Sequence, residues 1–217
     1  MDSSFWYRCW ERNTLGFHQR DVHPLLAQYF NKMVLPSDQH VFVPLCGKTF
    51  DMAYLAQFMQ VTGNELSAIA CRDFFLDNKL QYQRQTIGDF QHYACQQLAL
   101  WQGDFFKLSA DDIDRVDWIY DRAALIALPT TMQQQYVEHL TTFFTSQTRL
   151  FLVTLEYPEG QLNGPPFSIN NAAIKRLFSG FTIECIAENE LKDKQFAQRT
   201  FEVDYLLEKL YIIKHAR

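Results

Sequence analysis

Short runs of apolar residues alternate with amphipathic stretches along most of this 217-residue chain. Short apolar runs bounded by turn residues predict buried strands, and apolar positions three or four residues apart predict helices. We expect strands at 40–45, 61–66, 98–101, 117–120, 150–155, 181–187 and 205–214, and helices at 50–58, 67–78, 130–142 and 172–178. Such alternation predicts an α/β fold: a parallel sheet with helices on both faces and a ligand site at the carboxyl ends of its strands.

The segment 5–30 follows a different pattern and reads as an N-terminal extension. Phe5, Trp6, Cys9 and Trp10 recur at helical spacing, a turn follows at 13–16, and a second helix begins after Pro24. The aromatic stripe must pack against something. Core packing is the commoner role of such a stripe, and contact with a bound ligand is the alternative.

Composition indicates one globular domain over residues 1–217, because 47% of the residues are hydrophobic and no low-complexity linker divides the chain. The formal net charge is -5 without a basic run, which disfavours nucleic acid as a partner. Five widely spaced cysteines contain no C-x-x-C pair and fit a reducing cytoplasm. Neither a signal peptide nor a membrane-spanning segment is expected.

Glu65 ends the second predicted strand, where a carboxylate can accept hydrogen bonds from both hydroxyls of a ribose. Gly47 precedes it by close to the roughly 20 residues that separate glycine turn and acid in nucleotide-binding sheets. A carboxylate at this place can also cap the next helix, and both interpretations stay open.

Other chemistries are poorly supported. The loop after the first strand lacks G-x-G-x-x-G, which disfavours a nicotinamide dehydrogenase, and Phe42 stands where a phosphate-binding P-loop needs its first glycine. Cys46 lies beside Lys48 but has no local base, so a structural role is favoured over a nucleophilic one. His18 and His23 lack carboxylate companions, and no metal site is predicted.

Several motifs resemble the thiopurine S-methyltransferase family across essentially the whole chain. They are Phe5, Trp6 and Trp10, then GFHQ at 16–19, VFVPLCGKTFDM at 41–52, GNELS at 63–67, the pair Phe74 and Phe75, DRAAL at 121–125, GPPF at 164–167 and EKLY at 208–211. The PLCGK element is specific to this family. The sequence departs from the family at His23-Pro24, in a shorter segment between Met52 and Gly63, and at Lys194 and Gln195, where the family has an arginine before a phenylalanine.

The resemblance implies a class I methyltransferase: a seven-stranded, mostly parallel mixed sheet with an N-terminal helical extension, 1–35, that covers the cofactor site. The implied cofactor is S-adenosylmethionine. The positions implied for cofactor binding are Trp10, Leu45, Glu65, Asp104, Phe105 and Arg122, and those for substrate binding are Phe17, Phe167 and Lys194. Arg122 is also implied as the catalytic residue, at the place where the methionine end of the cofactor meets the acceptor.

The implied reaction is methyl transfer from a sulfonium to the thiolate of a small aromatic thiol. Such a reaction needs positioning, exclusion of water and a cation near the thiolate, for which Arg122 is the candidate. The alternatives are another small-molecule acceptor with oxygen, nitrogen, selenium or tellurium, or a cofactor-binding protein without catalysis. A monomer is expected.

Overall fold

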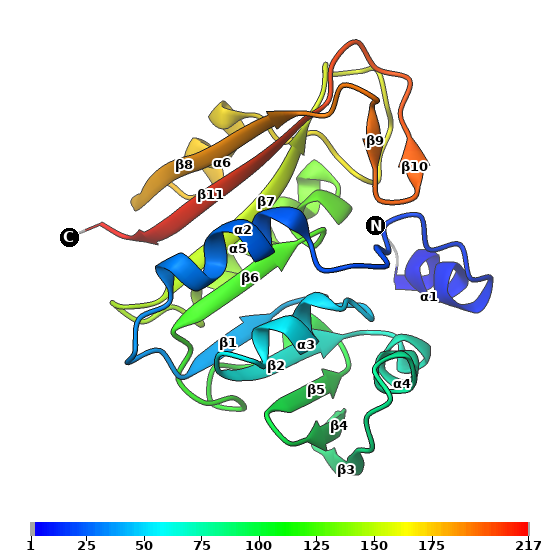
Figure 1. Ribbon diagram of the computed structural model, residues 1–217, viewed down its shortest axis with the longest axis vertical. Helices are drawn as coiled ribbons and strands as arrows, with labels where there is room; N and C mark the ends of the chain where they lie inside the picture. Colours follow the sequence, from blue (N-terminus) through cyan, green and yellow to red (C-terminus); the bar gives the residue numbers. More distant parts are fainter. Residues whose placement is uncertain (1–2, 217) are drawn as a thin grey trace.

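The computed structural model describes residues 3–216, and a nine-stranded sheet in the order β3-β4-β5-β2-β1-β6-β7-β11-β8 forms its centre (Figure 1). The strands are β1 (His40–Val43), β2 (Gln60–Glu65), β3 (Gln83–Ile87), β4 (Phe90–Cys95), β5 (Leu98–Gln102), β6 (Trp118–Arg122), β7 (Arg149–Glu156), β8 (Phe181–Glu190) and β11 (Leu207–His215). Strands β5, β2, β1, β6 and β7 are parallel neighbours, whereas β11 runs antiparallel to β7 and β8. The α/β prediction is confirmed.

The predicted count of seven strands is wrong, because an antiparallel hairpin of β3 and β4 extends the sheet beyond β5. The other seven strands are the predicted ones, with ends shifted by a few residues. Every residue of β3 is exposed, and its sequence QRQTI has no apolar alternation. Pairing with β4, not a buried face, makes this segment a strand, so the hydrophobic pattern could not reveal it.

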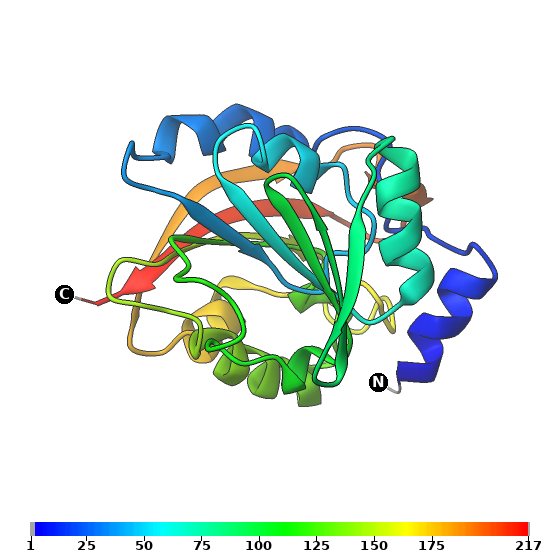
Figure 2. The ribbon, with the colours of Figure 1, turned by 90° about the horizontal axis from the view of Figure 1, so that it is seen from below.

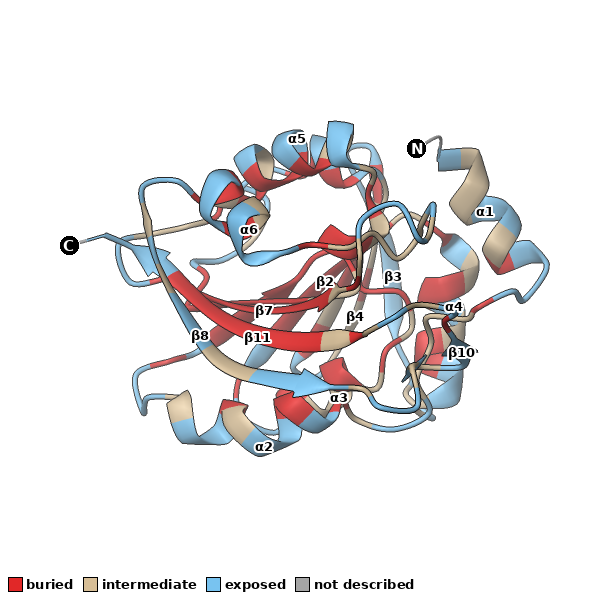
Figure 3. Ribbon diagram, turned by 90° about the horizontal axis from the view of Figure 1, so that it is seen from above, coloured by how far each residue is buried: buried red, intermediate tan, exposed pale blue. Residues whose placement is uncertain are grey.

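Helices cover both faces of the sheet (Figure 2). One layer holds α2 (Pro24–Met33), α3 (Asp51–Leu55) and α4 (Ala68–Asp77), and the other holds α5 (Thr130–Thr141) and α6 (Asn171–Leu177). The alternation of side chains along a strand divides the core between them: Val41 and Val43 pack toward the first layer and Phe42 toward the second. Figure 3 shows the buried central strands between these exposed outer faces.

The N-terminal extension separates into two parts with different roles. Leu25, Leu26 and Phe30 place α2 in the core, and none of its residues lines the pocket described below. Helix α1 (Ser3–Glu11) instead contacts α4, with Trp10 as its one buried residue. The prediction that 1–35 covers the site is therefore corrected to residues 3–18, called the cover below; residues 1 and 2 lie outside the described part.

Two further strands, β9 (Gln195–Phe196) and β10 (Arg199–Thr200), form a separate hairpin near the cover (Figure 1). It is called the β9–β10 hairpin below. The backbone N–H of Gln198 donates to the Gly16 carbonyl at 3.3 Å, and its side-chain Nε2 donates to the His18 carbonyl at 3.0 Å. Across residues 3–216 no helix is long and apolar enough to cross a membrane.

Candidate active site

A cavity of about 1090 Å³ opens at the carboxyl ends of the parallel strands, where an α/β sheet binds its ligand. Its floor is formed by residues that follow β1, β2, β5 and β6, and its roof by the cover and the β9–β10 hairpin. Of the residues predicted for the site, the cavity is lined by Trp10, Phe17, Leu45, Glu65, Asp104, Phe105 and Arg122. The fold thus brings together side chains that lie more than 100 residues apart in the sequence.

Glu65 is held at the end of β2 by two backbone groups. Its Oε2 accepts a hydrogen bond from the Gly47 N–H at 2.8 Å, and its Oε1 accepts one from the Ser67 N–H at 2.7 Å. Burial raises the pKa of Glu65 to about 7, and the backbone N–H groups limit this shift. Helix α4 is capped by the Ser67 side chain, which accepts from the Ala70 N–H. The capping role left open for Glu65 therefore belongs to Ser67.

The turn after β1 has a left-handed backbone at Leu45 and Gly47, with φ of 47° and 57°. Trp10 lies directly over this turn: a Cβ atom at Gly47 would be 3.4 Å from Trp10 Cζ2. Glycine therefore satisfies both the positive φ and the close approach of the indole. Phe17 meets Trp10 edge to face with ring centroids 5.8 Å apart, so the cover presents an aromatic surface to the cavity.

Asp104 and Phe105 follow β5 and open the 3₁₀ turn η1 (Phe105–Lys107). The Asp104 carboxylate accepts from the Phe106 N–H at 3.1 Å, which fixes the turn. Phe105 is buried and packs on Phe143 and Tyr136, so one edge of the cavity is rigid and apolar.

Arg122 lies in the cavity wall, but its charge is already paired. Its Nη2 is 3.1 Å from Asp51 Oδ2 and 2.9 Å from Thr49 Oγ1, and its Nη1 donates to the Phe17 carbonyl at 3.2 Å. Burial, the largest single influence, would lower the pKa of Arg122, but the charges of Asp51 and Tyr120 and the hydrogen bonds to them together outweigh burial and raise it. The sequence analysis named Arg122 as the candidate cation near the thiolate, and the structure pairs this cation with a buried carboxylate that largely neutralises its field.

Arg199 is a site residue that the sequence analysis missed. Three cations of the cavity wall have carboxylate partners: Lys48 with Asp77 at 2.8 Å, Lys107 with Asp89 at 2.9 Å, and Arg122 with Asp51. Within residues 3–216, Arg199 is the one Lys or Arg of this wall without such a partner. It donates to the Pro165 carbonyl at 2.9 Å and lies 5.1 Å from the Phe201 ring. Its place between two aromatic residues, Phe196 and Phe201, was the available signal.

Two predicted substrate residues, Phe167 and Lys194, do not line the cavity. Phe167 turns back on Gly164, where an added Cβ would meet its ring at 2.6 Å. Lys194 has a left-handed backbone, with φ of 54°, and its Nζ lies 3.8 Å from Glu190. The turn before β9 directs Lys194 toward β8, so we do not retain either residue in the site.

His18 and Cys46 line the same cavity with different chemical capacities. Burial, together with the charges of Lys48 and Arg122, lowers the pKa of His18, which keeps the imidazole neutral at pH 7. Burial raises the pKa of the Cys46 thiol well above its usual range, which supports the structural role predicted for it. No cluster of three or more His, Cys, Asp or Glu side chains suited to a metal ion occurs within the part of the chain that the structure describes.

Comparison with known proteins adds a family. The chain matches the family model described as Thiopurine S-methyltransferase (TPMT) over residues 1–216. Two relatives named thiopurine S-methyltransferase, from Shewanella baltica (strain OS223) and Shewanella sp. (strain W3-18-1), are 41% and 42% identical over 218 residues, which is 99% of each chain.

Solved structures share the fold at low sequence identity. Magnesium protoporphyrin IX methyltransferase from Synechocystis PCC 6803, solved with bound SAH, is 15% identical, with a TM-score of 0.64 over 98% of this chain and all of that one. A 1,6-didemethyltoxoflavin-N1-methyltransferase from Burkholderia thailandensis, solved with S-adenosylhomocysteine, is 14% identical, with a TM-score of 0.65 over 98% and 87%. This likeness confirms the predicted class of fold.

Proposed function

The chain belongs to the thiopurine S-methyltransferase family, and we propose that its pocket transfers a methyl group from S-adenosylmethionine to the sulfur of an aromatic or heterocyclic thiol, such as a thiopurine. One observation carries the proposal beyond the family name. A buried carboxylate, Glu65, faces one part of a cavity whose roof offers aromatic rings and the unpaired charge of Arg199. Such a cavity suits a nucleoside together with a flat, anionic acceptor.

The residues present fit the cofactor. Each Glu65 oxygen takes one backbone N–H and keeps a lone pair for a ribose hydroxyl. The Trp10 indole lies over the Gly47 turn, which binds that carboxylate, and Phe105 offers an apolar wall. We assign Trp10, Leu45, Glu65, Asp104 and Phe105 to cofactor binding, with Arg122 near the methionine end. When bound, S-adenosylmethionine supplies a methyl group on a sulfonium centre.

The chain's own task is to orient the acceptor and exclude water. The aromatic side chains of the cover, including Phe17, supply a dry wall on which a flat ring can stack. Arg199 offers a charge for the thiolate, and Arg122 offers its one remaining N–H group. In-line attack needs the sulfur held about 3–3.5 Å from the methyl carbon. Because opposite charges cancel in this reaction, a desolvated pocket favours the transition state over the separated ions.

The acceptor and the assembly state belong to the same proposal. We propose a small-molecule thiol as the sole partner and a monomer that acts in the cytoplasm without nucleic acid. Acceptors with oxygen, nitrogen, selenium or tellurium, and binding without turnover, are the alternatives that the experiment below separates.

The test combines binding and turnover. Titration calorimetry with S-adenosylhomocysteine should show one site per chain, and radiolabelled S-adenosylmethionine should then label aromatic thiols but not their hydroxyl and amino analogues. Preferred labelling of the analogues or of selenite would replace the thiol proposal. Tight binding with no labelling across the whole panel would indicate a binding protein without catalysis.

A further inference from the structure

Asp51 lies outside the cavity wall, yet it joins two segments that form this wall to the chain that follows the cover. It begins α3 and is fully buried. Its Oδ1 accepts a hydrogen bond from the His23 N–H at 2.8 Å, and its Oδ2 accepts one from the Tyr120 hydroxyl at 2.8 Å. The same Oδ2 lies 3.1 Å from Arg122 Nη2 and 3.3 Å from Arg122 Nε. One carboxylate therefore joins the chain before α2, the end of β6 and the loop after β1.

The donors of Arg122 are nearly all committed. A guanidinium has five N–H groups. Two of them reach Asp51, one reaches the Thr49 hydroxyl, and one reaches the Phe17 carbonyl. One N–H on Nη1 is left, and its direction is set by the plane of the guanidinium, which Asp51 fixes through two bonds. The Arg122 side chain is 5% exposed, so solvent cannot replace a lost partner easily.

The cover depends on the same pair of residues. Three successive carbonyls, those of Gly16, Phe17 and His18, accept hydrogen bonds from outside the cover. The outer two bind Gln198 of the β9–β10 hairpin, and the middle one binds Arg122. Just beyond the cover, His23 is anchored twice, by its N–H to Asp51 and by its Nε2 to Glu208 Oε1 at 2.9 Å.

We propose that Asp51 is a positioning residue for methyl transfer, which aligns the Arg122 guanidinium and, through Arg122 and His23, holds the cover closed over the cofactor. The inference rests on the proposed function. Without the carboxylate, the guanidinium loses two bonds and its counter-charge, and it turns away from the Phe17 carbonyl toward water. The acceptor then loses its oriented N–H, and the aromatic roof loosens.

Asp51 is ionised at neutral pH, as its ion pair with Arg122 requires. Burial, the largest single influence, would raise its pKa, but the charge of Arg122, the hydrogen bond and charge of His23 and the hydrogen bond from Tyr120 together outweigh burial and lower it. The groups around its carboxylate are the Arg122 guanidinium, the Tyr120 hydroxyl and the backbone N–H and side chain of His23, while the Thr49 hydroxyl accepts from the Asp51 backbone N–H. The ion pair thus persists at neutral pH.

A double-mutant cycle tests whether Asp51 acts through Arg122. The variants are Asp51→Asn, Arg122→Met and the double variant, assayed for kcat and KM with one aromatic thiol. We expect each single change to lower kcat at least tenfold and the double change to cost no more than the larger single loss. Losses that multiply would overturn the inference, as would a folded Asp51→Asn protein with wild-type kcat.

A second cycle uses Tyr120→Phe with Arg122→Met, because Tyr120→Phe leaves no buried charge unpaired if Asp51→Asn fails to fold. Tyr120→Phe should lower kcat about threefold in the wild-type protein and should not lower it further in the Arg122→Met protein. An equal loss in both backgrounds would contradict the coupling.

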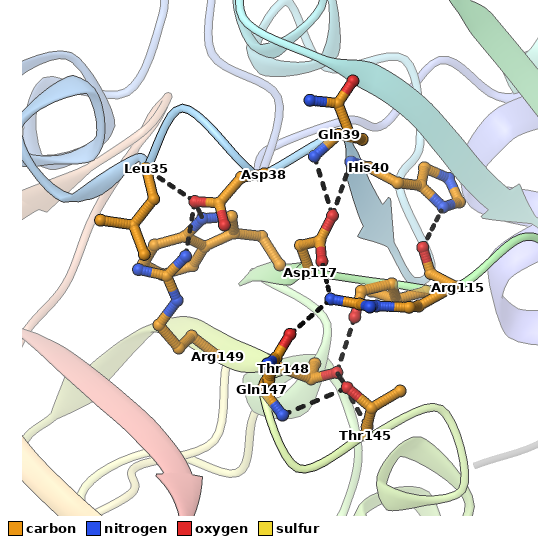
Figure 4. Close-up of polar contacts among 12 residues, drawn as sticks. Leu35, Asp38, Gln39, His40, Arg115, Asp117, Thr145, Gln147, Thr148 and Arg149 are labelled. Atoms are coloured by element: carbon orange, nitrogen blue, oxygen red, sulfur yellow. Dashed lines mark hydrogen bonds and ion pairs between the residues drawn. The ribbon is translucent and has the colours of Figure 1, made fainter.

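The matched control is another ion pair of the same protein, Asp38 and Arg149 (Figure 4). Both residues lie at the amino ends of the strands, whereas the cavity lies at the carboxyl ends. Arg149 also lies over the Trp118 ring, 4.0 Å from its centroid, so this pair is well packed and distant from the cavity. Asp38→Asn should lower the melting temperature and leave kcat unchanged.

Hydrogen exchange supplies a readout independent of turnover. With S-adenosylhomocysteine bound, amides of residues 14–23 should exchange at least tenfold faster in Asp51→Asn than in the wild type or in Asp38→Asn. Equal protection in all three proteins would overturn the part of the inference that concerns the cover. A wild-type protein that methylates no acceptor would instead refute the proposed function, whatever the exchange shows.

Discussion

The Gly47 amide and the Glu65 carboxylate are joined by a 2.8 Å hydrogen bond that ties the turn after β1 to the end of β2. A second amide, that of Ser67, holds the other carboxylate oxygen from the start of α4. The carboxylate is therefore oriented before any ligand arrives, at a residue that lines the cavity.

Glu65→Ala should weaken S-adenosylhomocysteine binding by roughly 10- to 100-fold, because hydrogen bonds to a charged group contribute about 1.5–3 kcal/mol. Titration calorimetry measures the change. Glu202→Ala, which removes an exposed carboxylate outside the cavity, is the control and should bind like the wild type. An unchanged dissociation constant in folded Glu65→Ala would remove this residue from the site.

The affinity for S-adenosylhomocysteine should depend on pH through Glu65. Its pKa of about 7 in the free protein means that the carboxyl group is mostly protonated at pH 6. Diol binding favours the ionised form, so the dissociation constant should rise by up to tenfold per pH unit below about 7 and stay flat above it. Glu65→Gln should abolish this dependence; an equally steep dependence in that variant would assign it to another group.

The stability of the free protein should also depend on pH through Glu65, and the direction of its pKa shift sets the sign. The pKa of Glu65 is raised above its unfolded value of about 4.3, so the folded state holds the proton longer. Its contribution to stability should fall as pH rises from about 4.3 to 7 and then level off. The difference in melting temperature between wild type and Glu65→Gln, followed across this range, isolates that contribution. A difference independent of pH would contradict it.

Arg199→Met should raise KM for the thiol about three- to tenfold with little effect on kcat. A cation that binds the thiolate stabilises the ground state at least as much as a transition state in which that charge is cancelled. The effect is modest because Arg199 is exposed and screened. Arg199→Lys should restore most of the affinity, and Arg84→Met, on the exposed strand β3, should change neither constant. A fall in kcat alone would contradict this role.

The pH dependence of kcat/KM should follow the acceptor. If the enzyme selects thiolate, the inflection shifts with the solution pKa of each aromatic thiol, and the plateau rises with a Brønsted slope at or below about 0.5. A protein base would instead give one fixed inflection. The His18 pKa is lowered from its usual 6.5, so such an inflection would lie below that value. His18→Gln should leave the pH profile unchanged. A variant profile without the inflection would instead identify His18 as the base.

Individual residues show which parts of the fold and of the site could be predicted from the sequence alone. The apolar runs predicted seven strands that exist, and the end of the second one placed Glu65 at the carboxyl edge of the sheet, because strand direction and edge follow from alternation with helices. The family motifs added Trp10, Leu45, Asp104, Phe105 and Arg122, all of which line one cavity. Their functional roles remain proposals.

The hydrophobic pattern could not predict features that depend on strand pairing, on turn geometry or on charges brought together in space. Strand β3 is polar and exposed, so only its neighbour β4 makes it a strand. Lys194 and Phe167 were assigned by motif position, but local turns direct both away from the cavity. Arg199 carries no motif, and its importance appears only when the other cations of the wall are seen to be paired.

The sequence by itself determined the class of fold, the family and the carboxylate at the end of β2, because burial periodicity and short motifs are local properties of the chain. Tertiary structure alone decided the electrostatics of the site. Arg122 is paired with Asp51, 71 residues earlier, and the carbonyls of Phe17 and His18 in the cover accept hydrogen bonds from Arg122 and Gln198. The field at an acceptor is a sum over neighbours in space, and the order of residues along the chain does not specify those neighbours.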